Sequence, residues 1–411
     1  MPTETSLNLN INNRDYFESP EGQSTVTKFV DKLKTEVGNQ AGYLETCKKA
    51  DETGIRLDSD TLEKLFDRFS DLIENTPPGH DVNHIRRDAL AGLAFASSDQ
   101  FVKSDYSPSD IDAGILGSIF HDIGNAVTRR YEDIKRANGH AEIGAYIFWK
   151  TSEGILGEDL RKLTTYAIAA HTHYLKPVPV KEPQGYERQP YWYEIFYPEN
   201  NKPCGLAPIL TRFSDRLEVN GGTVVTRTLI SYADASESGG QDFQGDQEFF
   251  EINKEKLETF FHPEVREGKP KPPTVLEHAL MFAESNFGNS IYSRDDHLFP
   301  IMEELIKTKT AQTDKLIQVV KAKPDMMDFS ELSAEAKAKD TIRQISGSKN
   351  FESAWNVLSQ AWRELDSETQ AKWKNGFEYI QRSYTEWLDL ILGKVGEEYK
   401  EFANKLAREC L

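Results

Sequence analysis

Histidines and aspartates in the first half of the chain are of the types that bind divalent metal ions. Six of the nine histidines lie between His80 and His173, and two of them, His80 and His121, are followed directly by an aspartate. Imidazole nitrogens and carboxylate oxygens are ligands of Mn, Fe, Co and Zn, so an ordered set of them indicates a metal site. The candidate metal ligands are His84, His121, Asp122, His140, His171 and Asp215.

The adjacent pair His121-Asp122 is central to this prediction. Two neighbouring residues can bind one cation if the backbone bends sharply between or just after them, and we expect Gly124 to supply the flexibility for that bend. The helix before the pair is expected to begin at Ser107-Pro108, with Ser107 as the N-cap. The pair then lies near the C-terminal end of this helix, where the terminal carbonyls favour a cation.

Three short motifs extend this observation to a family resemblance. They are Gly-His-Asp-Val-Asn-His-Ile-Arg-Arg at 79–87, Ile-Phe-His-Asp-Ile-Gly at 119–124 and Phe-Ser-Asp-Arg-Leu-Glu at 213–218. In this order they resemble the HD superfamily of metal-dependent phosphohydrolases, which carries a first His, a His-Asp pair and a distant Asp. The resemblance covers residues 77–233, less than half of the chain.

The resemblance implies a core ligand set and leaves one choice at its first position. That position could be filled by His80 or His84. The ligand of the motif stands three residues before an arginine, here Arg87, which favours His84 and gives His80 a capping or supporting role. The implied core ligands are His84, His121, Asp122 and Asp215.

Two further histidines decide between one metal ion and two. His140 and His171 resemble the additional ligands of dinuclear HD proteins, in which Asp122 would bridge two ions. In mononuclear relatives the equivalent histidines protonate the leaving group or hold the phosphate, and both roles stay open here. Helical periodicity points His171 toward the core. The implied cofactor is a divalent metal (Mn, Fe, Mg, Co or Zn), as one or two ions.

Basic residues accompany the motifs in a chain that is otherwise acidic. Arginine holds phosphate oxygens in a bidentate fork, so these residues fit a phosphate pocket. The predicted substrate-binding residues are Arg87, Arg216, Arg129, Arg130 and Lys176. The predicted catalytic residues are His140, His171 and Arg87.

The resemblance implies hydrolysis of a small phosphate ester, foremost a nucleotide, as a phosphomonoester or phosphodiester, by metal-activated water. Thr128-Arg129-Arg130 stands where guanosine tetraphosphate hydrolases carry a Glu-Asp pair, and the Gly-Tyr-Pro signature of the cyclic-di-GMP branch is absent. Neither of those two activities is therefore expected. One alternative is an HD-fold di-iron oxygenase, which uses nearly the same ligands; another is a non-catalytic, ligand-binding HD module.

Composition limits the class of protein. The chain has 411 residues, of which 38% are hydrophobic, and its three cysteines have no paired spacing, so metal binding must use His and carboxylate. The net charge of −18 argues against a nucleic-acid polymer as partner. No apolar run reaches the roughly 18 residues of a membrane span, which predicts a cytoplasmic protein without membrane contact. The expected partner is a small phosphorylated substrate. Assembly into a homodimer stays an open alternative.

Apolar residues recur at helical spacing along most of the chain, which predicts an all-α fold. We expect a helical cap over residues 1–72, an HD metal-dependent phosphohydrolase domain over 73–235 and a helical region over 236–411. Residues 178–203, which are rich in proline and aromatic residues, are expected to form a long loop or short hairpin beside the site. No chemical motif is recognisable after residue 245.

Overall fold

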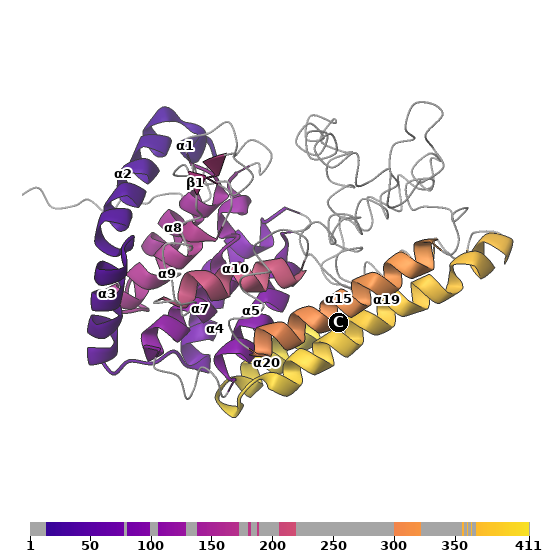
Figure 1. Ribbon diagram of the computed structural model, residues 1–411. Helices are drawn as coiled ribbons and strands as arrows, with labels where there is room; N and C mark the ends of the chain where they lie inside the picture. The colour runs from indigo at the N-terminus through magenta and orange to yellow at the C-terminus, as the bar shows by residue number, and fades with distance from the viewer. Residues whose placement is uncertain are drawn as a thin grey trace, which may run out of the picture. The chain divides into compact units, whose positions relative to one another are not determined.

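Helices dominate the described part of the chain, which confirms the predicted all-α class. The computed structural model describes residues 14–77, 80–98, 106–128, 138–171, 180–181, 187–188, 205–218, 300–321, 356, 360, 363 and 367–410. Within these ranges the strands are β1 (Val180–Lys181) and β2 (Glu187–Arg188), which pair antiparallel, and the other elements are helices (Figure 1). Among the described helices, none is both long and apolar enough to cross a membrane.

The chain divides into two compact units that alternate along the sequence. The first unit comprises Met1–His80 and Ser104–Arg212, and the second comprises Asp81–Lys103 and Phe213–Leu411. Helix α10 (Ala207–Glu218) therefore contributes its first half to one unit and its second half to the other. The three-part division expected from the sequence stays a prediction.

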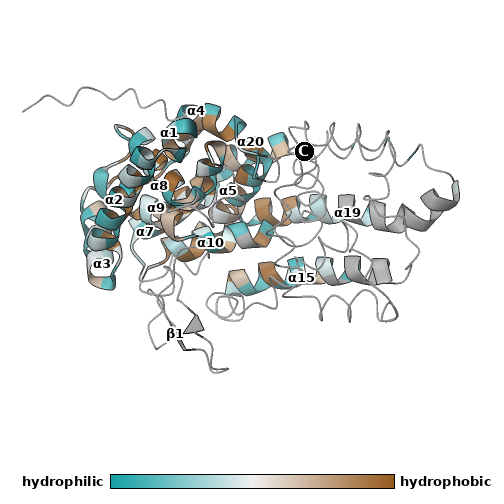
Figure 2. Cartoon of the chain, turned by 90° about the horizontal axis from the view of Figure 1, so that it is seen from above, coloured by the Kyte–Doolittle hydropathy of each residue, from teal (hydrophilic) through white to brown (hydrophobic). Residues whose placement is uncertain are grey.

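Amphipathic helices with polar caps begin the first unit. The side chains of Ser19, Asn39 and Asp58 each accept a hydrogen bond from a backbone N–H in the first turn of the helix that follows, as N-caps do. Hydrophobic and hydrophilic residues mix along these helices (Figure 2), and α2 and α3 pack on α9 (Glu158–Ala170). The four helices are α1 (Arg14–Glu18), α2 (Pro20–Val37), α3 (Gln40–Glu52) and α4 (Ser59–Glu74).

Helix α7 (Pro108–Phe120) is buried along nearly its whole length. The predicted start is confirmed, because the Ser107 hydroxyl accepts a hydrogen bond from the backbone N–H of Asp110 and Pro108 is the first helical residue. The helix ends at the cap residue His121, as the sequence predicted. The motif therefore lies at the end of a helix that the surrounding core holds on all sides.

Helices α7 and α9 pack against each other and run in the same direction. A Cβ built on Gly117 of α7 would lie 3.2 Å from the Cβ of Ala167 on α9. Four residues later each helix reaches its C-terminal cap, His121 in one case and His171 in the other. Parallel packing thus brings two histidines together at the same end of the helix pair.

Asp110, in the first turn of α7, connects three segments of the first unit. Its carboxylate accepts hydrogen bonds from the hydroxyl of Tyr43 (2.6 Å) and from the backbone N–H groups of Leu206 (2.7 Å) and Ala207 (2.8 Å). The last two bonds satisfy donors at the start of α10. Burial raises the pKa of Asp110 to about 6, although these hydrogen bonds act to lower it.

The C-terminal helices pack around the helix of the first motif to form the second unit. Helix α5 (Val82–Ala96) contacts α19 (Ser367–Lys394) and α20 (Lys400–Cys410), and α15 (Pro300–Lys321) lies along α19 (Figure 1). A short 3-10 turn, η4 (Glu397–Tyr399), precedes α20. The segment without a recognisable motif therefore supplies the core that holds α5.

Candidate metal centre

The carboxylate of Asp122 is the centre of a buried histidine cluster in the first unit. It follows the end of α7 and precedes the 3-10 helix η1 (Ile123–Ala126). Four imidazoles lie around it, and a side-chain amide, Asn125 Nδ2, donates to Asp122 Oδ1 at 2.9 Å. The histidines are His80, His121, His140 and His171, each at most 5% exposed.

Two of these imidazoles are held in the tautomer that leaves Nε2 as the metal-binding atom. Nδ1 of His121 lies 3.0 Å from the carbonyl of Ser118, and Nδ1 of His171 lies 2.6 Å from the carbonyl of Ile168. A carbonyl only accepts hydrogen bonds, so Nδ1 of each ring carries a proton, and Nε2 is the ring atom that remains to bind a metal ion. The two rings stand 4.8 Å apart at 72°.

The Nε2 atoms converge on the two oxygens of Asp122. His121 Nε2 is 3.5 Å from Oδ2, while His140 Nε2 and His171 Nε2 are 3.6 and 3.8 Å from Oδ1. Two ligand atoms that are each about 2.1 Å from one ion lie about 3.0–3.4 Å apart, so this spacing is close to that of a ligand set. The donor set, imidazole nitrogens with one carboxylate, fits Mn, Fe, Co or Zn.

His140 reaches this cluster because two backbone segments pass unusually close to each other. His140 is the first residue of α8 (His140–Thr151). A Cβ on Gly124 would lie 2.0 Å from the carbonyl oxygen of His140 and 2.7 Å from the backbone nitrogen of Gly144. Gly124 does not have the positive φ that a flexible bend would use. The structure gives Gly124 a role that was not predicted: the missing side chain lets η1 touch α8.

The cluster keeps Asp122 ionised. Burial alone would raise the pKa of this carboxyl group, but the charges and hydrogen bonds of His80 and His121 hold its pKa well below the usual range. Nδ1 of His80 contacts Asp122 Oδ2 directly, whereas Asp81, not His80, is the N-cap of α5. A buried carboxylate in this state is ready to bind a cation.

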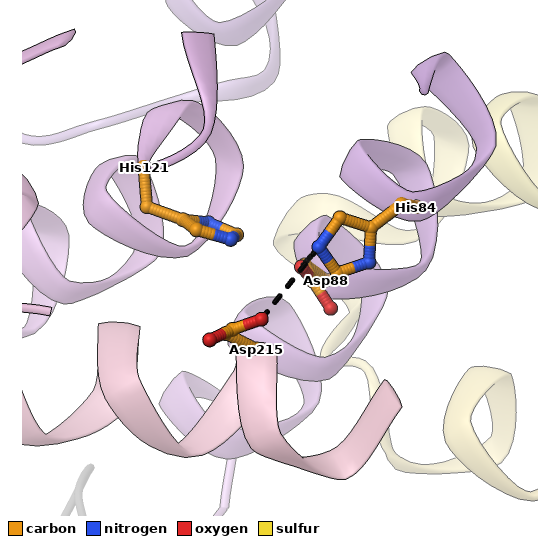
Figure 3. Close-up of side chains that lie close together, drawn as sticks. All are labelled: His84, Asp88, His121 and Asp215. Carbon is orange, nitrogen blue, oxygen red and sulfur yellow. Dashed lines mark ion pairs between the residues drawn. The ribbon is translucent and has the colours of Figure 1, made fainter. Parts of the chain in front are cut away.

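A second set of metal-binding side chains belongs to the second unit. His84 on α5 lies one turn before Asp88, and its Nε2 is 3.1 Å from Asp88 Oδ2 and 3.7 Å from Asp215 Oδ1 of α10. Figure 3 shows the three side chains pointing toward one another. The sequence predicted His84 and Asp215 as ligands but missed Asp88, although a spacing of four residues on a helix puts it on the face of His84.

A buried ion-pair network follows one turn further along the same helices. Arg87 Nε pairs with Glu218 Oε2, and Lys309 Nζ of α15 lies 3.7 Å from Glu218 Oε1. Burial raises the pKa of Glu218, but Arg87 and Lys309 outweigh it and lower that pKa to about 2; burial lowers the pKa of Lys309 to about 8. Arg87, predicted to bind phosphate, therefore has a buried carboxylate as partner, and its role toward substrate stays a prediction.

Other predicted residues are beyond what the structure describes. Arg129, Arg130 and Lys176 lie outside the described residues, as does most of the predicted loop at 178–203. The backbone of Arg216 belongs to α10, but its side chain is not described. Their assignment to substrate stays a prediction.

No protein-family model matches the chain, and comparisons with curated proteins and with solved structures find no match either. The HD resemblance therefore depends on the three sequence motifs. The helical fold and the buried His and Asp groups that could hold a metal ion are consistent with an HD-like site.

Proposed function

We propose that the chain is a metal-dependent phosphohydrolase of the HD type that hydrolyses a small phosphate ester, foremost a nucleotide. The observation that carries the proposal is the ionised, buried carboxylate of Asp122 with four imidazoles around it. Such a set has no evident use in packing, because polar side chains are costly to bury unless they bind one another or a ligand. The motif order adds His84 and Asp215 to the same function by resemblance.

When bound, a divalent ion supplies Lewis acidity toward a phosphate oxygen and lowers the pKa of a water molecule. The protein side chains orient that chemistry. His121 and His171 present Nε2 because their Nδ1–H groups are held by backbone carbonyls. Asp122 is available as a bridging carboxylate, since it has two oxygens with imidazoles near each of them.

His140 and His171 keep two proposed roles. As ligands they would raise the number of bound ions to two. As acids they would deliver a proton from Nε2 to the leaving oxygen, a transfer that requires the imidazole to be protonated. Arg87, Arg216, Arg129, Arg130 and Lys176 are proposed to neutralise phosphate charge.

The function is tested by a phosphate-release screen over nucleoside mono-, di- and triphosphates and cyclic nucleotides, with Mn²⁺ and with Fe²⁺. We expect release with at least one nucleotide class, and its loss in Asp122→Ala. Asp389→Asn changes an exposed carboxylate on α19 and serves as the control that retains activity. Release that is equal in Asp122→Ala and in the unmodified chain would contradict the assignment.

The same ligand types allow one rival chemistry. Four imidazoles around one carboxylate also suit iron, as an HD-fold di-iron oxygenase would require. Two equivalents of iron with oxygen uptake and no phosphate release from any nucleotide would favour that rival. Absence of metal binding altogether would favour a ligand-binding module without catalysis.

A further inference from the structure

Arg212 of α10 is a buried arginine that lies just before the third sequence motif and belongs to none of the three. Its side chain is 1% exposed, and its Nη1 donates a hydrogen bond to the backbone carbonyl of His171 at 2.7 Å. The two residues are 41 positions apart in the sequence. This bond therefore joins α10 to the end of α9, where a histidine of the proposed metal centre stands.

The carbonyl of His171 is a favourable partner for a buried cation. His171 is the C-cap of α9, and the last carbonyls of a helix have no acceptor role within the helix. These carbonyls also form the negative end of the helix dipole, which attracts a positive charge. Burial of a guanidinium costs free energy, and a hydrogen bond to the helix end offsets part of that cost. Arg212 thus caps α9 from a different helix, as basic side chains do at helix C-termini.

The last turn of α9 holds His171 only weakly through its own backbone. The backbone nitrogen of His171 lies 3.4 Å from the carbonyl oxygen of Ile168, beyond the roughly 2.7–3.2 Å of an ordinary N–H···O bond. The same carbonyl accepts the ring Nδ1–H of His171 at 2.6 Å. The bond from Arg212 is therefore a second anchor for a residue whose Nε2 lies 3.8 Å from Asp122 Oδ1.

The backbone that carries Arg212 is fixed by close packing of three helices. A Cβ built on Gly117 of α7 would lie 2.0 Å from Thr211 Oγ1 of α10 and 3.2 Å from the Cβ of Ala167 on α9. Thr211 is the residue before Arg212, and it is completely buried. Arg212 consequently extends from a rigid support, so its guanidinium can hold the end of α9 in place.

We propose that Arg212 is a positioning residue that fixes His171 in the direction of Asp122. The guanidinium holds the backbone carbonyl of His171, the carbonyl of Ile168 holds its ring, and together they aim Nε2 at the carboxylate. This inference rests on the proposed function for the use made of His171, as a metal ligand or as an acid, and it applies to either role. Arg212 itself acts only through His171.

The test is nitrogen-15 NMR of the metal-free full chain labelled at histidine. The Nδ1–H signal of His171 is identified by its absence from His171→Ala. We expect this proton to exchange with water at least about tenfold faster in Arg212→Met, because a charge-assisted hydrogen bond no longer opposes local opening. The Nδ1–H of His121, which bonds to a different carbonyl, should be unchanged and serves as an internal reference.

Two further variants complete this experiment. Arg68→Met makes the same chemical change at an exposed position of α4 and should leave both histidine signals unchanged. Arg212→Gln, which keeps a short neutral donor, carries the test if Arg212→Met does not fold. The inference is overturned if exchange of the His171 proton is unaffected in the folded Arg212 variant. It is also overturned if the His121 proton is accelerated equally, since that result indicates general loosening of the core.

A double-substitution cycle measures the functional consequence. Zn²⁺ affinity and phosphate release are compared for His171→Ala, Arg212→Met and the double variant. Whichever quantity His171→Ala lowers, Arg212→Met should lower too, and the double variant should stay within about twofold of His171→Ala, because the two residues act as one unit.

Losses that multiply in the double variant would overturn the inference, since they indicate that Arg212 acts independently of His171. If His171→Ala lowers neither quantity, the proposed role of His171 fails. The NMR result on the metal-free chain then still decides whether Arg212 positions this residue.

Discussion

Gly124→Ala should separate η1 from α8 and thereby disturb the histidine cluster without changing any metal-binding side chain. The added Cβ would lie 2.0 Å from the carbonyl oxygen of His140, whereas ordinary contact begins at 3.4 Å. The backbone of one segment must therefore move by at least about 1.4 Å. Overpacking of this kind costs about 1–3 kcal/mol of unfolding free energy.

The movement should weaken metal binding because His140 is the residue displaced. Its Nε2 lies 3.6 Å from Asp122 Oδ1. Distances between a metal ion and its ligands stay within about 0.2 Å of their ideal values. A shift of 1 Å or more would remove His140 from the proposed ligand set. We expect the affinity for Zn²⁺ to fall by about 10–100-fold, the loss seen when support for a metal ligand is removed.

The assay combines urea unfolding with Zn²⁺ titration of the chelator-treated protein. Gly157→Ala is the matched control, because nothing lies within 4 Å of the Cβ it would add at the N-cap of α9. The control should leave metal affinity within about twofold of the unmodified chain. If Gly124→Ala bound Zn²⁺ as tightly as the control and unfolded at the same urea concentration, the close contact of η1 with α8 would be refuted.

Three further predictions concern packing within each unit. Asp110 has a pKa of about 6 in the folded chain, above its ordinary 3.8, so its contribution to stability is complete below pH 3.8 and is lost as pH rises through 6. The unfolding free energy from urea titrations should fall by about 2 kcal/mol between pH 4 and pH 7, and Asp110→Asn should flatten this pH dependence. Glu218→Gln leaves Arg87 and Lys309 buried beside a neutral amide and should cost about 3–5 kcal/mol in the same assay; a cost below about 1 would contradict the network. Gly393→Ala meets open space in α19 and should raise stability by about 0.5–1 kcal/mol, and a thermal melt that shows a loss would contradict this packing.

Local sequence signals predicted the elements of the centre well. Ser107-Pro108 marks the start of α7 because capping and proline chemistry act within one turn. Helical periodicity directed His171 inward, and it is 1% exposed. The pair His121-Asp122 was predicted at the end of α7, which is where the structure has it.

Contacts between distant segments could not be predicted in the same way. Lys309 meets Glu218 across 91 positions of sequence, and no spacing rule connects α15 with the third motif. Asp88 has the right helical spacing from His84, but spacing alone does not distinguish a ligand from a buried partner. The close approach of α8 to Gly124 could not be predicted either, because only the packed structure reveals it.

Asp122 is the centre of the proposed metal site. The most direct test is calorimetric titration with Zn²⁺ of the unmodified chain and of Asp122→Asn, which keeps the size of the side chain and removes its charge. We predict at least about a tenfold loss of Zn²⁺ affinity in the variant, with an unchanged circular dichroism spectrum. Equal Zn²⁺ affinity in the two proteins would contradict a role for Asp122 in metal binding.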